Sequence, residues 1–293
     1  MTGTIMKGIG GFYYVKCDSG TVFSCRARGR FRKDGQVPMV GDRVEIEITD
    51  PEEKEGYVTK IGPRKNQFFR PPVSNIDLLL VTFAISAPEP ALELIDKLTV
   101  TAVSQGADCA VCINKAELNR EKAADLAKEY ALADFPVIVC SAKTGEGVDR
   151  LKDLLKGKVT ALAGSSGVGK SSLLNAMGEN FTLKTGAVSD KIQRGKHTTR
   201  HTELFPLSFG GFVFDTPGFG SFEVEKMMAQ NLSAMFPEIA KHGGQCRFPG
   251  CSHITEPDCS VKDALNRGEI GQNRYNSYCA LYNSLKDVKD WQL

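Results

Sequence analysis

The segment Gly164–Ser171 constrains the fold of this 293-residue chain most, because it follows the pattern Gly-x4-Gly-Lys-Ser of a phosphate-binding loop, or P-loop. The apolar run Val159–Ala163 precedes it and predicts a buried strand, and a helical pattern begins at Lys170. A loop between a strand and a helix presents backbone N–H groups and a helix N-terminus, which together bind phosphate. The sequence therefore predicts an α/β sheet with a phosphate site at one edge.

Within this loop, Lys170 is expected to reach the β- and γ-phosphates of a nucleotide, and the Ser171 hydroxyl is expected to bind Mg²⁺. Gly164 and Gly169 permit the tight turn. A Gly/Ser loop that only resembles the motif is the alternative, and the flanking strand and helix argue against it. The predicted phosphate-binding residues are Gly164, Ser165, Ser166, Gly167, Val168, Gly169, Lys170, Ser171 and Ser172.

A second phosphate-facing motif, Asp-Thr-Pro-Gly at 215–218, follows a short apolar run. Asp215 is expected to hold Mg²⁺ through water, and the Gly218 N–H is expected to meet the γ-phosphate. The polar stretch before this motif contains Thr198 and Thr199, and either hydroxyl could complete the Mg²⁺ shell. We favour Thr199, with an ordinary strand entry as the alternative for the pair.

Two further motifs follow apolar runs at 109–113 and 137–140, so they are expected at the carboxyl ends of strands, where open α/β sheets bind ligands. Asn114 is expected to brace a base and the neighbouring loop, and Lys115 to pack along the ring. Glu117 can accept from the guanine N1–H and N2–H₂, although Asp is usual there, so guanine affinity stays open. The predicted base-binding residues are Asn114, Lys115, Glu117, Ser141, Ala142 and Lys143, with the Ala142 N–H meeting the guanine O6.

The order of these motifs is unusual, because the base-reading pair precedes the P-loop and the Asp-Thr-Pro-Gly switch instead of following them. A pocket built from loops at strand ends tolerates this order, since the loops meet in space whatever their order along the chain. The order does change which part of the chain follows the Asp-Thr-Pro-Gly switch, because the C-terminal domain now comes directly after it. We therefore expect loss of the γ-phosphate to reposition the C-terminal domain.

Residues 1–65 carry short alternating apolar and polar runs, which predict a small antiparallel β-barrel with strands at 11–15, 21–25, 43–48 and 56–61. The proline-containing basic segment 63–72 is expected to be a linker. Residues 26–33 carry five cations and one aromatic ring with no acid. Barrels bind RNA through such segments, and a solvated charged loop is the alternative.

From residue 75 the chain alternates between strand and helix patterns, which is typical of a mostly parallel sheet covered on both faces. The predicted strands are 77–85, 109–113, 137–140, 159–163 and 211–214, and the predicted helices are 91–105, 120–131, 148–156 and 170–177. After residue 222 we expect a helix, a Cys/His cluster and a helix from about 271 to 289.

The Cys/His cluster has the spacing Cys-x4-Cys-x-His-x5-Cys and consists of Cys246, Cys251, His253 and Cys259. Three thiolates and one imidazole form a closed tetrahedral set, so the site is expected to hold one structural Zn²⁺. Coincidence among buried thiols is the alternative. The other six of the nine cysteines lie mostly in apolar contexts and are expected to be reduced.

The formal net charge of +2 gives no overall field for a polyanion, so contact with nucleic acid must come from local patches. The N-terminus lacks the apolar core of a signal peptide. The longest apolar run, 78–85, is too short to cross a bilayer. We expect a cytoplasmic monomer that binds neither DNA nor membranes.

Taken together, the motifs resemble the circularly permuted GTPases, and most closely the ribosome small subunit-dependent GTPase A (RsgA) family. The resemblance covers nearly the whole chain and includes Arg-Gly-Lys-His-Thr-Thr-Arg at 194–200. It implies an N-terminal OB-fold β-barrel, a central permuted P-loop α/β GTPase domain and a mostly helical zinc-binding domain, at 1–66, 72–222 and 223–293. It also implies hydrolysis of GTP stimulated by the small (30S) ribosomal subunit during late assembly, with the barrel contacting rRNA.

The group that orients the attacking water is not evident, because Phe219 stands where Ras-like enzymes carry a glutamine. His197, beside the threonine pair, is the candidate, and the resemblance supports it. A structural or RNA-contacting histidine is the alternative. Slow hydrolysis without a partner is therefore expected.

Two functions stay open at this point. The first is a GTP hydrolase that acts as a checkpoint in ribosome assembly. The second is an RNA-binding assembly factor that uses GTP mainly as a conformational ligand. A kinase or ATPase is disfavoured, since the base-site motifs favour guanine.

Overall fold

The computed structural model describes the chain except for residues 30, 32–35, 70, 180–201, 216–228 and 288–293. It contains two compact units, each made of several segments. The first unit comprises Met1–Leu78, Leu155–Leu162 and Gly178–Phe219, and the second comprises Leu79–Leu154, Ala163–Met177 and Gly220–Leu293. The predicted division into three domains at 66 and 222 stays a prediction.

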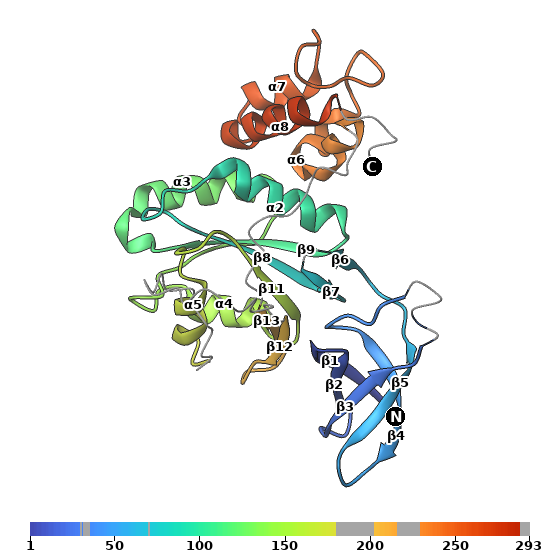
Figure 1. The fold of residues 1–293 in the computed structure, drawn as a ribbon. Coiled ribbons are helices and arrows are strands. Elements are labelled where there is room, and N and C mark those ends of the chain that lie inside the picture. Colours follow the sequence, from blue (N-terminus) through green and yellow to red (C-terminus); the bar gives the residue numbers. More distant parts are fainter. Residues whose placement is uncertain (30, 32–35, 70, 180–201, 216–228, 288–293) are drawn as a thin grey trace, which may run out of the picture. The chain divides into compact units, whose positions relative to one another are not determined.

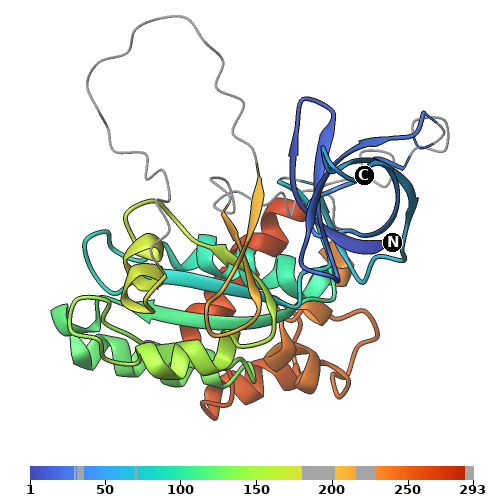
Figure 2. The same cartoon turned by 90° about the horizontal axis from the view of Figure 1, so that it is seen from below.

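The N-terminal part of the first unit is a closed five-stranded barrel, seen nearly end-on in Figure 2. The strand order is β1-β2-β3-β5-β4, and β4 pairs with β1 to close the ring. Its strands are β1 (Thr2–Ile9), β2 (Phe12–Cys17), β3 (Val22–Ala27), β4 (Arg43–Asp50) and β5 (Glu55–Ile61). This OB-like barrel confirms the predicted fold.

Alternation of side chains explains why these segments form strands. In β4, Val44 and Ile46 are buried, while the charged residues that alternate with them are exposed, namely Arg43, Glu45 and Glu47. The barrel pairings are antiparallel, as predicted, except that β3 and β5 pair in parallel. A closed ring of five strands cannot be antiparallel at every pairing. Because the other four pairings are antiparallel, β3 and β5 must run in the same direction. The sequence also gave no indication of β1.

The segment expected to be a linker forms a small hairpin, β6 (Gln67–Phe69) and β7 (Pro72–Ser74). Buried Asp42 attaches it to the barrel, because its carboxylate accepts from Arg64 at 2.7 Å and from Ser74 at 2.6 Å. The neighbouring Gly41 has a φ of +96°, and a Cβ there would overlap the Ser74 carbonyl. Only glycine therefore fits between the barrel and the hairpin.

Three further strands complete the first unit, namely β11 (Val159–Ala163), β12 (Glu203–Pro206) and β13 (Phe212–Asp215). β11 pairs with β13 in parallel, and β12 pairs with β13 antiparallel. β12 also pairs with the barrel strand β1, where Lys7 lies opposite Glu203 and forms a 2.6 Å ion pair. The barrel and these strands therefore share one hydrogen-bonded sheet.

The second unit contains the strands β8 (Leu78–Ala84), β9 (Asp108–Asn114) and β10 (Val137–Val139), in the order β10-β9-β8. β9 and β10 are parallel, and every residue of β8 is buried. Figures 1 and 2 show α2 (Leu92–Ser104) and α3 (Arg120–Ala131) on one face, with α4 (Val148–Leu155) and α5 (Lys170–Ala176) on the other. The predicted sheet covered on both faces is confirmed.

The C-terminal part of the second unit, orange to red in Figure 1, contains the 3₁₀ helix η3 (Ala229–Met235), then α6 (Pro237–Gly243), α7 (Ser260–Asn266) and α8 (Gln272–Leu285). These helices enclose an apolar cluster in which Phe236 meets Tyr278 edge to face, with ring centroids 5.4 Å apart. Val100 of α2 belongs to the same cluster, so the helices pack directly on α2. No helix within the described residues is long and apolar enough to cross a membrane.

Candidate nucleotide and metal sites

The P-loop follows β11 in the chain, and its glycines adopt conformations that other residues rarely reach. Gly164, Gly167 and Gly169 have φ values of +135°, +80° and +95°. A Cβ on Gly164 would overlap the Thr82 carbonyl, and one on Gly169 would overlap the Asn114 side chain. The loop therefore needs glycine both for its turn and for its close approach to neighbouring segments.

Lys170 begins α5 and folds back over the loop. Its ammonium donates to the carbonyls of Gly164 at 2.6 Å and Ser165 at 2.9 Å. Burial lowers the pKa of this ammonium. The cation is therefore held inside the loop, beside the N-terminus of α5, where an anion would be bound. Ser171 is half-buried, whereas Ser166 and Ser172 are exposed.

Asn114 ends β9 and is 1% exposed. Its side-chain amide donates to the Val168 carbonyl at 2.9 Å, and its oxygen accepts from the Ala142 N–H at 3.2 Å. One side chain therefore joins the P-loop to both base-reading segments. The Ala142 N–H, predicted to meet the guanine O6, would have to share its proton between that atom and Asn114.

The other base-reading side chains surround this contact. The ammonium of Lys115 donates to the Ala87 carbonyl, in the loop after β8. Glu117 lies on the 3₁₀ helix η1 (Ala116–Leu118), and its buried Oε2 has no hydrogen-bond partner among the residues that the structure describes. A hydrogen bond with Ser141, and then the charges of Lys143 and Lys115, lower the pKa of Glu117. An ionised oxygen without a partner fits a base that offers N–H donors.

Arg120 and Glu146 form an ion pair between the two base-reading segments, and the sequence did not predict it. Arg120, at the start of α3, donates to both carboxylate oxygens of Glu146 at 2.9 and 2.7 Å. The Glu146 carbonyl accepts from the Ser141 N–H at 2.9 Å, which closes the turn around Ser-Ala-Lys. The two residues are 26 positions apart, so no local pattern in the sequence identifies this pair.

Several predicted residues cannot be placed. His197, Thr198, Thr199 and Gly218 lie outside the residues that the structure describes. Asp215 is the last residue of β13, and its side chain is likewise outside the description. Their predicted contacts with Mg²⁺, water and the γ-phosphate stay predictions.

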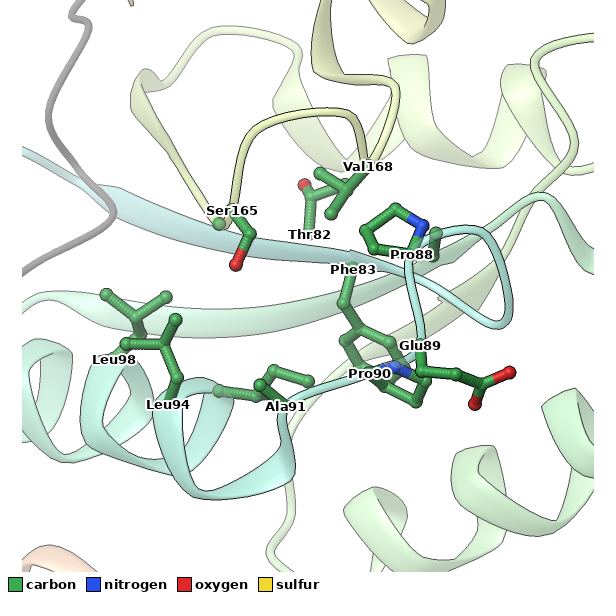
Figure 3. A pocket seen from close by; sticks show the side chains of 13 residues that line it. Thr82, Phe83, Pro88, Glu89, Pro90, Ala91, Leu94, Leu98, Ser165 and Val168 are labelled. Carbon is green, nitrogen blue, oxygen red and sulfur yellow. The ribbon is translucent and has the colours of Figure 1, made fainter.

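A small cavity lies beside the P-loop, as shown in Figure 3. Ser165 and Val168 form one wall, and Leu94 and Leu98 of α2 form another. Phe83 of β8 and the prolines at 88 and 90 complete it. The contact between the P-loop and α2 is therefore not close-packed.

The four predicted metal ligands converge in the C-terminal part of the second unit. Their ligand atoms all lie within 4.8 Å of one another. The Cys246 Sγ is 3.8 Å from the Cys259 Sγ, and the His253 Nδ1 is 3.4 Å and 3.5 Å from these two sulfurs. Tetrahedral bonds to zinc of about 2.3 Å from sulfur and about 2.0 Å from nitrogen give separations of about 3.8 and 3.5 Å. The residues therefore fit Zn²⁺, and the set leaves no position for a substrate.

Neighbouring groups hold these ligands in place. Burial by itself raises the pKa of the Cys246 thiol. Hydrogen bonds with the Ser260 side chain and with the backbone N–H groups of Ser260 and Val261 outweigh this effect, so the pKa of Cys246 is lowered. Burial lowers the pKa of His253 and thus favours the neutral imidazole that a metal needs. Tyr278 of α8 donates to the Ser252 carbonyl at 2.8 Å, between the ligands Cys251 and His253. Sequence spacing identified the ligands but not these supports.

A P-loop joined through Asn114 to Asn-Lys-x-Glu and Ser-Ala-Lys segments at strand ends defines a GTPase. Because the base-reading segments come first in the chain, the class is that of the circularly permuted GTPases.

Comparisons with known proteins agree with this class and identify the family. The model of the RsgA N-terminal domain matches residues 2–58, and the model of the RsgA GTPase matches residues 61–225. The chain belongs to the RsgA GTPase family. Proteins named small ribosomal subunit biogenesis GTPase RsgA from Agathobacter rectalis and Caldanaerobacter subterraneus are 45% and 46% identical to it. These alignments cover 98% of this chain in both cases, and 99% and 96% of those proteins.

Solved structures agree over the same extent. YjeQ from Thermotoga maritima superposes with a TM-score of 0.81 and 34% identity, covering 98% of this chain and 99% of that chain. YloQ, described as a circularly permuted GTPase, superposes with a TM-score of 0.79 and 35% identity, covering 98% and 96%. Family membership favours the hydrolase over a factor that uses GTP only as a conformational ligand.

Proposed function

We propose that this chain hydrolyses GTP in the biogenesis of the small ribosomal subunit, and that binding of the subunit stimulates hydrolysis. The observation that carries the nucleotide assignment is the position of Asn114, whose side chain joins the P-loop to the Ser-Ala-Lys turn. The small-subunit assignment is supported by the printed names of relatives that match this chain over nearly its whole length.

The described residues support the following roles in this reaction. Lys170, already held by P-loop carbonyls, would move to the β- and γ-phosphates, and its charge would stabilise the transition state. Glu117 would accept from the guanine N–H groups through its unpartnered oxygen. Mg²⁺, when bound, neutralises phosphate charge, and Ser171, Thr199 and Asp215 are the proposed residues around it.

Water positioning is the part of the mechanism for which we propose a residue from sequence alone. His197 is our candidate, because Phe219 can neither donate nor accept a hydrogen bond. Because the usual water-orienting glutamine is absent, hydrolysis without a partner would be slow. We propose that the subunit completes the catalytic arrangement around the attacking water during late assembly.

The barrel is our proposed contact for rRNA. Arg26 stacks over Phe12 with its guanidinium 4.5 Å from the ring centroid, which presents a cation and a ring together. Arg28 forms an ion pair with Glu47 in which both side chains are largely exposed, so phosphate could displace that partner. We further propose a structural zinc in the Cys/His cluster, a monomer without DNA or membrane contacts, and a cytoplasmic location.

The test is the rate of GTP hydrolysis with and without purified small subunits. Large subunits serve as the control for the partner and ATP as the control for the base. The proposal predicts slow hydrolysis of GTP alone, strong stimulation by small subunits, and neither stimulation by large subunits nor comparable turnover of ATP. Binding to small subunits without any rise in GTP turnover would contradict it.

A further inference from the structure

Arg274, near the start of α8, is a charged side chain in the interior of the second unit, with an exposure of 1%. Its guanidinium donates to Asp96 of α2 at 2.7 Å and to Glu238 of α6 at 2.7 Å. It also donates to the Thr99 hydroxyl of α2 at 2.9 Å. One side chain therefore bonds the C-terminal helices to α2.

Aromatic rings and a helix cap fix this arrangement further. The guanidinium lies 4.6 Å from the ring centroid of Phe236 and 5.6 Å from that of Tyr130 on α3. Glu129 of α3 accepts from the backbone N–H groups of Asn273 at 2.6 Å and Arg274 at 3.2 Å. The first N–H groups of a helix have no partner within that helix, so Glu129 of α3 caps the start of α8.

The same helix holds the ligand loop, defined as residues 246–259. Tyr275 donates to the His253 carbonyl at 2.7 Å, and Tyr278 donates to the Ser252 carbonyl at 2.8 Å. Arg274 and these two tyrosines lie within about one turn of α8. Movement of that turn would therefore change the position of the ligand loop.

α2 faces the P-loop across the small cavity. Leu94 and Leu98 line the cavity that Ser165 and Val168 also line, whereas Asp96 and Thr99 bond to Arg274. α2 is thus one rigid element with the phosphate site beside it and Arg274 bonded to it.

We propose that Arg274 is a positioning residue that couples nucleotide binding at the P-loop to the ligand loop, through α2 and the first turn of α8. The inference rests on the nucleotide site proposed above. Nucleotide that orders the P-loop restricts α2, and Arg274 passes this restriction to α8. By linkage, the coupling acts equally in both directions.

The variants must separate coupling from folding. Arg274→Met alone leaves two buried carboxylates without a partner, which destabilises strongly. We therefore combine it with Asp96→Asn and Glu238→Gln, which removes the buried charges together. Arg274→Lys is the second variant, because it keeps the charge but cannot bond to both carboxylates as the planar guanidinium does. The matched control is Arg267→Met, which removes an exposed arginine that pairs with Glu269 at 2.9 Å.

The experiment is hydrogen exchange of the ligand loop in the full chain, with saturating GDP and without nucleotide. In the wild type and in Arg267→Met, GDP is expected to slow exchange there on the order of fivefold or more, as a typical coupling between sites does. In both Arg274 variants the loop is expected to exchange at the same rate with and without GDP, although GDP is bound. If Arg274 had only a structural role, its variants would change the rate of exchange of the loop, but GDP would still slow that exchange.

Two results overturn the inference while the proposed function stands. One is a wild-type ligand loop whose rate of hydrogen exchange is the same with and without bound GDP. The other is a ligand loop in both Arg274 variants whose exchange GDP slows as much as it does in the wild type. Failure of the wild type to bind GDP, measured separately by calorimetry, would overturn both the inference and the proposed nucleotide site.

Discussion

The side-chain amide of Asn114 donates a 2.9 Å hydrogen bond to the carbonyl of Val168, 54 positions further along the chain. In a permuted sequence this bond joins the base-reading half of the site to the P-loop that comes after it. The Asn114 oxygen also accepts from Ala142 at 3.2 Å. A residue at a strand end thereby assembles the site from three separate segments.

Replacing Gly164 by alanine should abolish measurable GDP binding, because a Cβ there would overlap the Thr82 carbonyl and displace the P-loop. Gly178→Ala is the matched control, since Gly178 has a φ of +85° but nothing within 4 Å of a Cβ. That control should lose only about 1 kcal/mol of stability through backbone strain. Calorimetric titration with GDP measures the first effect and thermal unfolding the second. Equal GDP affinity in both variants would show that the close approach is unimportant.

Glu117→Gln should weaken GDP binding on the order of 10- to 100-fold, because an amide replaces a charged acceptor worth about 1.5–3 kcal/mol. Glu117→Asp should retain binding, and Glu121→Gln on the neighbouring helix is the control. The pKa of Glu117 is lowered in the folded chain, so its carboxylate stays ionised down to a lower pH than an ordinary glutamate does. The contribution of Glu117 should therefore be constant from about pH 5 to 8 and be lost only as pH falls through the lowered pKa. A loss of that contribution between pH 7 and 6 would be incompatible with this reasoning.

Purified wild-type protein should contain about one zinc ion per chain, and Cys259→Ser should contain none. Cys279→Ser is the matched control, because Cys279 is a half-buried cysteine outside the four-ligand cluster. Metal analysis after purification without chelators measures both. Stoichiometric zinc in Cys259→Ser, or its loss from Cys279→Ser, would refute the assignment of ligands.

His197→Ala should keep GTP binding but lose most of the turnover stimulated by small subunits, about 10²-fold or more if this residue positions the attacking water. His201→Ala, four positions away in the sequence, is the control. Stimulated single-turnover kinetics separate hydrolysis from nucleotide binding and product release. An unchanged stimulated rate in His197→Ala would assign water positioning to another group.

Motifs at strand ends could be predicted because they combine a local sequence signal with a local structural context. The apolar run ending at Ile113 predicts a strand, so the site of Asn114 follows from the sequence. The strands β1 and β12 could not be predicted this way. β1 contains two glycines and β12 has only four residues, so neither shows a clear alternating pattern, and their pairing with each other at Lys7 and Glu203 joins segments far apart in the sequence.

Buried charge was the other feature that the sequence did not reveal. Arg274 lies in a polar stretch that looks like a solvated helix surface. It is buried because its two carboxylate partners, 178 and 36 positions away, come from other helices. Polar residues become interior when distant segments supply partners, and no periodicity within one helix reports this. The metal ligands, by contrast, were predictable because all four fall within one short loop.

The central claim is that Asn114 unites permuted segments into one guanine-nucleotide site, and calorimetric titration with GDP and ADP tests it most directly. The control is Asn276→Ala, which removes an exposed asparagine from α8. Wild type and control should bind GDP at least about 100-fold more tightly than ADP, and Asn114→Ala should lose GDP affinity on the order of 10- to 100-fold, through two buried hydrogen bonds. Equal affinities for GDP and ADP in the wild type, or wild-type GDP affinity in Asn114→Ala, would contradict the claim.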